Sequence, residues 1–401
     1  MSTAAHEREL PSTLSIPDGN TSSSPVPQRS ALIDLDAISQ NIVTIRRLAG
    51  SALVMAVLKA DGYGHGLVPA AQAALRGGAD YLGTAVLEEA FELRRAGITA
   101  PIFSWLSAPG SDYEGAIRED IDVAAYDVPQ LAEICRAAGK VRRPAKIHLK
   151  IDTGMWRGGA TAEQWPMLCS AARRAQADGL IEVTGIWSHL ASADEPGNPS
   201  LFEQLAAFRV ALAVAMDHGI RPKLRHIANS AATLNCPEAH FDMVRPGLAV
   251  YGVNPLPQQY QTAQMQLRPA MTLCASVAHV KPAPAGAAVS YGGTERTTTP
   301  TNLAIIPLGY ADGVMRSASS RGPVQIGDGR YRVIGRICMD QFIVPIGQDP
   351  IVAGQQAILF GPGDRGEPHV QEWADAAGTI PYEILTRIGS RVPRVYGQPE
   401  R

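Results

Sequence analysis

The sequence has little of several features that mark specialised proteins. It contains no run of eighteen or more apolar residues, so we expect no membrane-spanning helix. Basic residues (36) and acidic residues (38) nearly balance, which argues against a nucleic-acid-binding protein, because such proteins present a basic face. The five cysteines include no CxxC pair, and the closest two, Cys135 and Cys169, are 34 positions apart. We therefore expect free thiols in a reducing cytoplasm rather than disulfides or a zinc site.

The length and composition of the chain suit an enzyme built from two domains. Its 401 residues exceed one hydrophobic core, and 45% of them are hydrophobic against 18% charged, an ordinary globular mixture. Residues 1–28 differ, because they are rich in Ser, Thr and Pro and lack apolar periodicity. Pro11, Pro17 and Asp18 interrupt every stretch that could serve as a secretory signal. We predict that residues 1–28 form a disordered tail.

Eight short apolar runs recur from residue 53 onward, and most are followed by an Ala-rich helical segment. They are Leu53–Lys59, Tyr81–Val86, Ile102–Leu106, Asp122–Tyr126, Lys146–Asp152, Val183–His189, Leu224–Asn229 and Met243–Val250. Their starts lie 19 to 41 residues apart, enough for a crossover helix in most gaps. Eight such units predict an α/β fold in which residues 29–265 form a (β/α)8 TIM barrel. A doubly wound open sheet remains the alternative, because the number of strands alone does not close a barrel.

After about residue 266 the pattern changes to short strands joined by Gly/Pro turns. The expected strands are Thr272–Val280, Leu303–Pro307, Val333–Cys338, Phe342–Pro345 and Ala357–Phe360. Helical spacing returns only at residues 370–377 and 382–388. Residues 266–401 are therefore predicted to form a second, mostly β domain.

A lysine ends the first predicted barrel strand, where TIM-barrel enzymes carry reactive groups. Burial of Lys59 would lower the pKa of its amine and make it a nucleophile. A lone lysine is more often a solvated surface residue, but three glycines, Tyr63 and His65 directly behind Lys59 favour a site.

Two further loops carry groups that suit a phosphate. Asn229-Ser230 follows the seventh predicted strand and Gly247-Leu248 lies in the eighth, although Asn-Ser is more often a helix cap. A lysine amine beside a phosphate-binding cup would fit pyridoxal phosphate, held as a Schiff base.

Other charged side chains near the strand ends allow both a structural and a functional interpretation. His189 and Arg245, each taken alone, are more often structural. Lys150 shares one strand face with His148 and Asp152. If that face lines the barrel, a charged Lys150 is costly unless it is paired or chemically altered. The structural alternative is a Lys150–Asp152 pair that is partly open to water.

Together, these motifs resemble the alanine racemase family. The stretch AVLKADGYGHG, residues 56–66, resembles that family's cofactor-lysine signature. The motifs HLKIDTGMWR, HIANSAATL, MVRPGLAVYG, VSYGG, PLGYADG, RICMDQ and PYEILTRIGSRVPRVY also match, in the family's order. The similarity covers about residues 30–396. The family's fold, a barrel followed by a β domain, agrees with the fold that the strand pattern predicts.

The resemblance implies a racemase with two opposed bases. Lys59 would hold pyridoxal 5'-phosphate and act as the base on one face of the substrate Cα. Tyr291 would be the base on the other face, reaching in from the partner subunit of a homodimer. On the residues alone, a tyrosine on a turn is a poor base unless a cation lies close by. Arg245 would bond the pyridine nitrogen, and because arginine does not readily give up a proton, it would weaken the cofactor's electron sink and limit side reactions.

The remaining site residues take supporting roles in the resemblance. His189 would back the cofactor ring, and His226 would support Arg245 or Tyr291. Residues that would hold the phosphate are Tyr63, Ser230, Gly247 and Leu248, with Asn229 nearby.

Substrate binding is assigned in the same way. Arg157 and the backbone N–H of Met339 would take the substrate carboxylate, and Lys150 matches a lysine that many members carry as a carbamate. The entrance would be shaped by Tyr310, Arg316, Arg336 and Asp340.

The predicted activity is the interconversion of L- and D-alanine, with D-alanine supplying peptidoglycan precursors. Three positions depart from the family pattern: Ser390 replaces a common tyrosine, Glu295 a common aromatic, and Trp156 a small or amide residue. They leave open a racemase for another, larger or polar amino acid in a specialised pathway. A barrel-type amino-acid decarboxylase would pair an acid with the pyridine nitrogen, which Arg245 speaks against. A non-catalytic pyridoxal-phosphate carrier would have no use for Tyr291.

Overall fold

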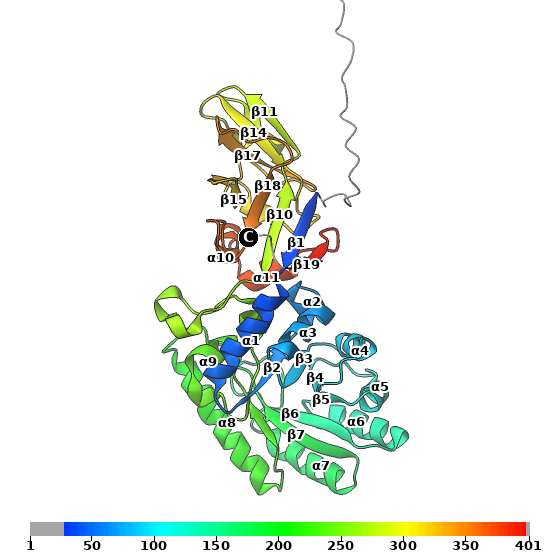
Figure 1. Cartoon of the computed structure of the whole chain (residues 1–401). Helices are drawn as coiled ribbons and strands as arrows, with labels where there is room; N and C mark the ends of the chain where they lie inside the picture. Colours follow the sequence, from blue (N-terminus) through cyan, green and yellow to red (C-terminus); the bar gives the residue numbers. More distant parts are fainter. Residues whose placement is uncertain (1–27, 398–401) are drawn as a thin grey trace, which may run out of the picture.

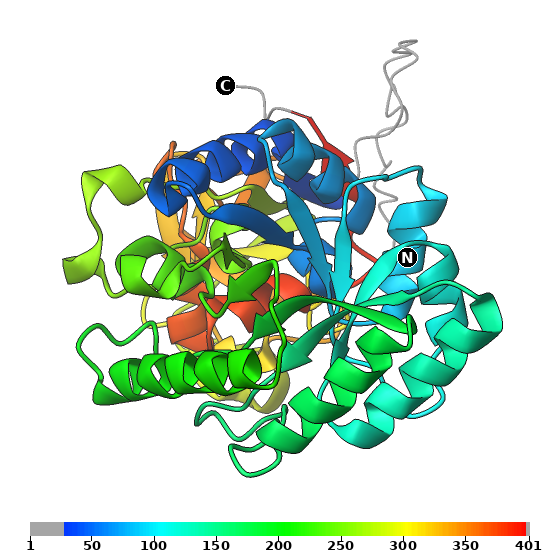
Figure 2. The same cartoon turned by 90° about the horizontal axis from the view of Figure 1, so that it is seen from below.

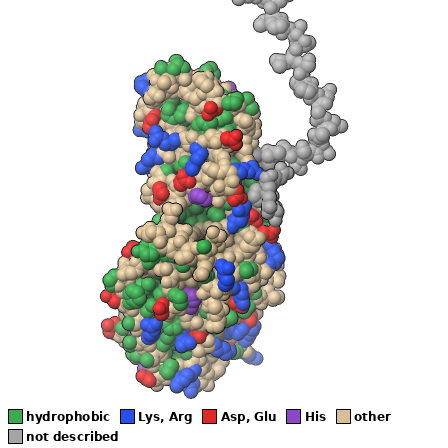
Figure 3. Space-filling view, turned by 60° about the vertical axis from the view of Figure 1, so that its left-hand side comes forward, with side chains coloured by type: hydrophobic (Ala, Val, Ile, Leu, Met, Phe, Trp, Pro, Cys, Tyr) green, Lys and Arg blue, Asp and Glu red, His purple; other side chains and the backbone are tan. Residues whose placement is uncertain are grey.

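The computed structural model describes residues 28–397, in which a barrel carries a β domain on one of its ends (Figure 1). The predicted tail lies outside the described residues except for Gln28. In the space-filling view the two domains meet at a waist (Figure 3).

Eight parallel strands form the barrel that the sequence predicts. They are β2 (Leu53–Val57), β3 (Tyr81–Thr84), β4 (Ile102–Ser104), β5 (Ile121–Ala125), β6 (Ala145–Lys150), β7 (Ile181–Trp187), β8 (Leu224–His226) and β9 (Met243–Val244). The strand order is β8-β7-β6-β5-β4-β3-β2-β9. Between the two outer strands, the Asp242 N–H donates to the Arg225 carbonyl and the Arg245 N–H to the Ala228 carbonyl, both at 3.0 Å. The ring is therefore nearly closed, and the TIM-barrel prediction is confirmed.

Helices surround the strands, as the view from below makes plain (Figure 2). They are α1 (Leu35–Ala49), α2 (Lys59–Tyr63), α3 (Leu67–Arg76), α4 (Leu87–Arg95), α5 (Tyr113–Arg118), α6 (Val128–Val141), α7 (Trp165–Ala177), α8 (Pro199–Asp217) and α9 (Ser230–Asn235). Local sequence sets their starts: the Asp34 and Asp127 carboxylates cap α1 and α6 by accepting backbone N–H groups. Among the described residues, α8 alone is long and apolar enough to cross a membrane, and it buries Leu205 and Phe208 in the barrel wall.

The interior of the barrel is packed rather than open. Buried side chains from six strands form a cluster of their own, separate from the larger core under the helices: Met55, Phe103, Ala124, Trp187, Leu224 and Met243. Such packing leaves the end of the barrel as the place for a site.

The second domain is mostly strands, as expected. Its six-stranded sheet has the order β16 (Gly329–Arg332), β15 (Pro323–Ile326), β18 (Gln356–Phe360), β10 (Met271–Ser276), β1 (Arg29–Ile33) and β19 (Arg394–Tyr396). A three-stranded sheet contains β11 (His279–Ala283), β14 (Thr301–Ile306) and β17 (Phe342–Gly347), and β12 (Ala288–Val289) pairs with β13 (Glu295–Arg296). Two helices, α10 (Val370–Ala377) and α11 (Pro381–Thr386), complete it.

The first described strand belongs to the second domain, although the sequence analysis grouped residues from 29 onward with the barrel. β1 pairs antiparallel with β10 and parallel with β19. The sequence of a five-residue strand does not show which sheet the strand joins, because its partner strands lie far along the chain. The chain therefore enters the barrel only at α1 and returns to the six-stranded sheet at β10.

Several expected strands are shorter or absent. The segment 272–280 contributes to two strands, β10 and β11, which lie in different sheets. Residues 333–338 form no strand, because Gly335 has a φ of +72°, outside the extended range, at a place where a Cβ would lie 2.7 Å from the Val289 carbonyl oxygen. β9 ends at Val244, and residues Leu248–Tyr251 form a 3-10 helix after Pro246, which lacks the N–H that a strand needs.

Candidate active site

Lys59 opens a left-handed turn rather than closing a strand. Ala60, Asp61 and Gly62 have φ values of 56°, 54° and 60°, and Tyr63 has a φ of 53°. Each L-residue in this region costs about 1–2 kcal/mol, so the turn requires support from its surroundings.

Two carboxylates support that turn, Glu89 from outside it and Asp61 from within it. The Ala60 N–H donates to Glu89 Oε1 at 2.6 Å, and the Leu67 N–H donates to Asp61 Oδ1 at 2.7 Å. Glu89 belongs to α4 and also accepts the Ala85 N–H at 3.0 Å. The turn is thereby fastened to the next βα unit of the barrel.

A cavity of about 310 Å³ opens beside Lys59, between α2 and α11. Its lining includes Tyr63 and Tyr382, whose ring centroids lie 6.1 Å apart. Burial, followed by the positive charge of Arg157, lowers the pKa of the Lys59 amine, while Glu89 opposes this shift. A larger share of the amine is therefore unprotonated and nucleophilic than in an exposed lysine.

The loops after β8 and β9 meet in a small polar cup. Ser230 Oγ accepts the Gly247 N–H at 2.8 Å and the Ala249 N–H at 3.3 Å. A Cβ on Gly247 would clash with the Tyr63 hydroxyl, so only glycine allows this approach. Leu248 is buried behind the cup. The Asn229 side chain accepts the Ala232 N–H at 3.1 Å, which makes Asn229 the cap of α9, as its structural interpretation required.

Arg245 is buried at the end of β9, and its guanidinium contacts neutral groups only. It donates to the Ser188 carbonyl at 2.8 Å, to His226 Nδ1 at 3.1 Å and to His189 Nδ1 at 3.2 Å. No carboxylate of the described residues lies within ion-pair distance of it. Its face packs against Trp187, with the guanidinium carbon 5.1 Å from the ring centroid. A permanently charged donor is thus held inside the barrel by carbonyl and imidazole acceptors.

The hydrogen bonds that connect Arg245 to His226, His148 and Asp122 all have the same donor-to-acceptor direction, away from Arg245. Because His226 Nδ1 accepts from Arg245, its Nε2 carries the proton and donates to His148 Nδ1 at 2.8 Å. His148 Nε2 then donates to Asp122 Oδ2 at 3.1 Å, which also accepts the Tyr81 hydroxyl. Burial and the charge of Arg245 keep the pKa of His226 well below its usual value, so the ring stays neutral.

His189 is in the same electrostatic field. Burial, then the charges of Arg245, Arg157, Lys150 and Lys59, hold the pKa of His189 well below its usual value. Four cationic side chains therefore act on one point at this end of the barrel, an arrangement that favours anionic ligands.

Lys150 lies 4.8 Å from the Tyr126 ring and 4.6 Å from the Trp187 ring and is only 6% exposed. Burial, then Arg157 and Arg245, lower its pKa to about 8, against the opposing charge of Asp152. Asp152 instead accepts the N–H groups of Gly154 and Trp156, at 2.9 and 3.1 Å, and shapes the loop that carries Arg157. Lys150 is thus neither solvated nor paired with Asp152, the structural alternative that the sequence left open.

The second-domain candidates form a separate group on the surface. Ser290 Oγ donates to the Arg336 carbonyl at 2.6 Å, which ties the Tyr291 turn to the loop of Met339. The Tyr310 N–H donates to the Cys338 carbonyl at 3.0 Å and brings a second turn to the same loop. The most exposed of the tyrosines is Tyr291, at 72%. The group consists of Tyr291, Tyr310, Arg316, Arg336, Met339 and Asp340.

The structure thus brings the predicted residues together in two sets. Hydrogen bonds, ring contacts and electrostatic interactions connect the barrel set, but among residues 28–397 no hydrogen bond or ion pair joins it to the second-domain set. The sequence analysis missed Glu89, Asp122 and Tyr382, which support the barrel set.

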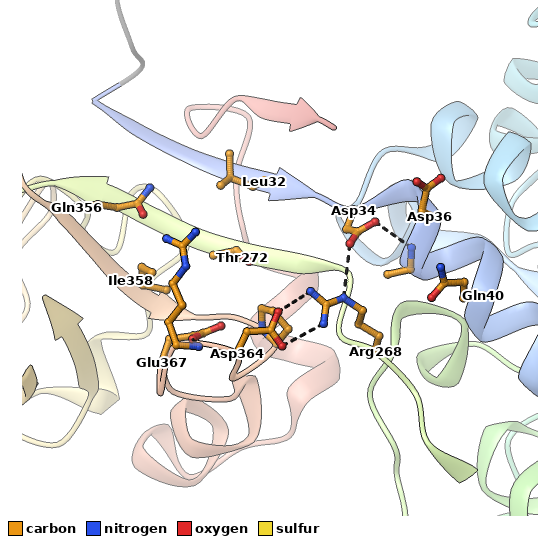
Figure 4. A pocket seen from close by; sticks show the side chains of 13 residues that line it. Leu32, Asp34, Asp36, Gln40, Arg268, Thr272, Gln356, Ile358, Asp364 and Glu367 are labelled. Carbon is orange, nitrogen blue, oxygen red and sulfur yellow. Dashed lines mark hydrogen bonds and ion pairs between the residues drawn. The ribbon is translucent and has the colours of Figure 1, made fainter. Parts of the chain in front are cut away.

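A larger cavity, of about 970 Å³, lies at the junction of the two domains and contains none of the predicted site residues (Figure 4). Arg268 crosses it with two hydrogen bonds to Asp364, of 3.1 and 2.6 Å, and an ion pair with Asp34 at 3.6 Å. These contacts connect the cap of α1 to the loop after β18.

The fold and the site define a class: a (β/α)8 barrel with a lysine amine and a small polar cup at its mouth, joined to a β domain. The family model described as "Alanine racemase, N-terminal domain" matches residues 33–255, and "Alanine racemase, C-terminal domain" matches residues 270–396. The chain belongs to the alanine racemase family, whose members are isomerases.

Relatives named alanine racemase cover nearly the whole chain. The chain is 54% identical to that of Salinispora tropica over 371 residues, covering 92% of this chain and 98% of the relative. It is 52% identical to that of Frankia casuarinae over 366 residues, covering 91% and 95%. The crystal structure of alanine racemase from D-cycloserine-producing Streptomyces lavendulae superposes with a TM-score of 0.92 at 52% identity, covering 94% of this chain and 99% of that one.

Proposed function

We propose that this protein interconverts L- and D-alanine with pyridoxal 5'-phosphate as its cofactor. The observation that carries the proposal is the convergence of a Lys59 amine of lowered pKa with the Ser230–Gly247 cup and the buried Arg245. The substrate follows from the relatives, which are named alanine racemases.

The residues present fit this cofactor. Lys59 offers an amine to its aldehyde, and the neutral surroundings of Arg245 leave that guanidinium able to bond the pyridine nitrogen. His189 would lie behind the ring. The phosphate would be held by Tyr63, Ser230, Gly247 and Leu248, with Asn229 nearby.

When bound, the cofactor withdraws electrons from the substrate Cα and makes its proton acidic. The Lys59 amine takes or returns that proton on one face, since its lowered pKa leaves it able to act as a base. The Tyr291 hydroxyl does the same on the opposite face. Because Arg245 keeps its own proton, it would hold the pyridine nitrogen without protonating it, which would limit side reactions.

The substrate carboxylate is held by Arg157 and the backbone N–H of Met339. We propose that Lys150 is carbamylated, which replaces a buried amine with an anion that would hold Arg157 in place. The entrance is shaped by Tyr310, Arg316, Arg336 and Asp340.

The active unit is a homodimer. Tyr291 and Met339 belong to the second-domain set, which forms no hydrogen bond or ion pair with Lys59 within residues 28–397, so each site would take them from the partner. The enzyme acts in the cytoplasm, and its D-alanine supplies cell-wall precursors.

Proton NMR of L-amino acids in D2O, with enzyme and pyridoxal phosphate, tests the function. Loss of the alanine α-proton signal together with accumulation of D-alanine is expected. Exchange without inversion would show that Lys59 works but Tyr291 does not. No exchange with any amino acid, despite bound cofactor, would overturn the racemase proposal, and faster reaction of another amino acid would change the assigned substrate.

A further inference from the structure

His65 lies buried beneath the left-handed turn that follows Lys59. Its Nδ1 is 3.1 Å from the Gly62 carbonyl oxygen and 3.0 Å from the Tyr63 carbonyl oxygen. Carbonyl oxygens only accept hydrogen bonds, so Nδ1 carries the proton and donates to both. Nε2 has no hydrogen-bond partner among residues 28–397. The hydrogen bonds of the His65 ring within the described chain are therefore made to carbonyl groups of the turn.

The charge state of the ring is fixed by its surroundings. His65 is fully buried, and burial lowers its pKa to about 4 in spite of the two backbone hydrogen bonds, which oppose the shift. At neutral pH the ring has a single proton, and the two carbonyl groups keep that proton on Nδ1.

The same ring connects the two ends of the turn. It stacks on Tyr251, with ring centroids 4.5 Å apart, and Tyr251 lies 4.9 Å from the Tyr63 ring. The Tyr251 hydroxyl donates at 3.1 Å to the carbonyl of Val57, the last residue of β2, which precedes Leu58 and Lys59. His65 and Tyr251 therefore restrain the segment from Val57 to Tyr63 as one unit.

The turn needs this restraint because L-residues avoid its conformation. Ala60, Asp61 and Tyr63 all have positive φ values, and Tyr63 must place its hydroxyl against Gly247. If the turn relaxed, the lysine amine and the tyrosine hydroxyl would move relative to the cup of Ser230.

We propose that His65 is a positioning residue whose Nδ1–H holds the left-handed turn in the form that binds cofactor. The inference rests on the proposed use of pyridoxal phosphate and adds to it a residue that touches neither cofactor nor substrate. His65 acts on Lys59 and Tyr63 through the backbone carbonyls of the turn and through its stacking on Tyr251.

An isosteric pair of variants separates the hydrogen bond from packing. His65→Asn retains a hydrogen-bond donor near the position of Nδ1. His65→Leu places a side chain of the same shape as asparagine there, but it has no hydrogen-bond donor. Apoprotein is titrated with pyridoxal phosphate and the absorbance of the lysine adduct is followed, with thermal unfolding of each apoprotein as the check on folding. We expect His65→Leu to raise the dissociation constant about tenfold or more above that of His65→Asn. Equal affinities, or tighter binding by His65→Leu, would overturn the proposal.

Relief of the backbone strain provides a second, independent test. Ala60 is exposed, and glycine there adopts a positive φ without penalty. In the His65→Leu background, Ala60→Gly should recover about fivefold in cofactor affinity. Absence of any recovery would show that His65 does not act by holding the strained turn, and it would overturn the proposal. A wild-type apoprotein that binds no pyridoxal phosphate would instead overturn the proposed function, which distinguishes the two failures.

Discussion

Among single residues, the buried Arg245 shows how a charge can be retained without a counter-ion. Its acceptors are carbonyl oxygens and two imidazole nitrogens, and burial with the charge of Arg157 lowers its pKa without making it a practical proton donor. The positive potential that results acts on every titratable group around it, including Lys150 and His189.

The pKa of Lys59 should respond to its charged neighbour. Arg157→Gln removes the second cause of the lowered pKa, so the pKa should rise while remaining below the usual lysine value, since burial is the larger cause. At neutral pH a smaller fraction of the amine is then unprotonated. The measurement is the pH dependence of amine labelling at Lys59 in the apoprotein, resolved by mass spectrometry. Arg225→Gln, which removes an exposed partner of Asp242, serves as the control, and a midpoint that falls in Arg157→Gln would contradict the assignment.

Lys150 should bind carbon dioxide. A pKa of about 8 leaves part of the amine neutral near pH 7.5, and the neutral amine adds to CO2 with loss of a proton. A carbamate resonance is expected in 13C NMR after equilibration with labelled bicarbonate. It should vanish in Lys150→Met and persist in Lys146→Met, which alters a lysine of the same strand that pairs with Asp120. A resonance that survives in Lys150→Met would refute the carbamate.

The sequence predicts candidate reactive residues better than it predicts the residues that only support them. Lys59 and Arg245 stand in recognisable motifs at strand ends. Glu89 and Asp122 lie in other βα units, and the pairing of β2 with β3 and of β5 with β6 brings them beside the Lys59 turn and His148. No spacing in the chain encodes those contacts.

At the level of elements, the site depends on backbone approach as much as on side chains. The turn after Lys59 and the loop after β9 meet where the Tyr63 hydroxyl lies against Gly247. The prediction of a strand through residue 250 failed here: β9 ends at Val244, and Pro246, whose carbonyl still accepts the Val57 N–H at 3.0 Å, has no N–H to donate to a neighbouring strand. Short apolar runs specify burial, while Gly and Pro within them decide the geometry.

Gly247→Ala should therefore weaken cofactor binding strongly. The added Cβ would clash with the Tyr63 hydroxyl and displace either the tyrosine or the loop. We expect a loss of cofactor affinity of about tenfold or more, read from absorbance titration of the apoprotein. Gly139→Ala is the matched control, because a Cβ in that α6 helix meets its nearest atom at 4.0 Å and stabilises the helix by up to about 1 kcal/mol. Equal affinities in the two variants would show that the close approach is not needed.

For the whole molecule, the proposed homodimer with shared sites predicts that two inactive variants can complement each other. Lys59→Ala and Tyr291→Phe each remove one base, and a mixed dimer regains one complete site. Random mixing gives half mixed dimers with one working site each, so about a quarter of wild-type activity should return. The activity of an equimolar mixture after denaturation and refolding measures this. Mixtures no more active than the separate variants would show that each protomer is self-contained.

The six-stranded sheet of the second domain affects how the chain folds during its synthesis. Because β1 pairs with β10 and β19, the barrel is an insertion between neighbouring strands of the second domain. During synthesis β1 leaves the ribosome before the barrel does. It stays unpaired until β10, which follows the whole barrel, has also left the ribosome. A chain that stops within the barrel would expose that strand's edge to other chains, so interrupted translation should yield aggregates rather than a soluble barrel.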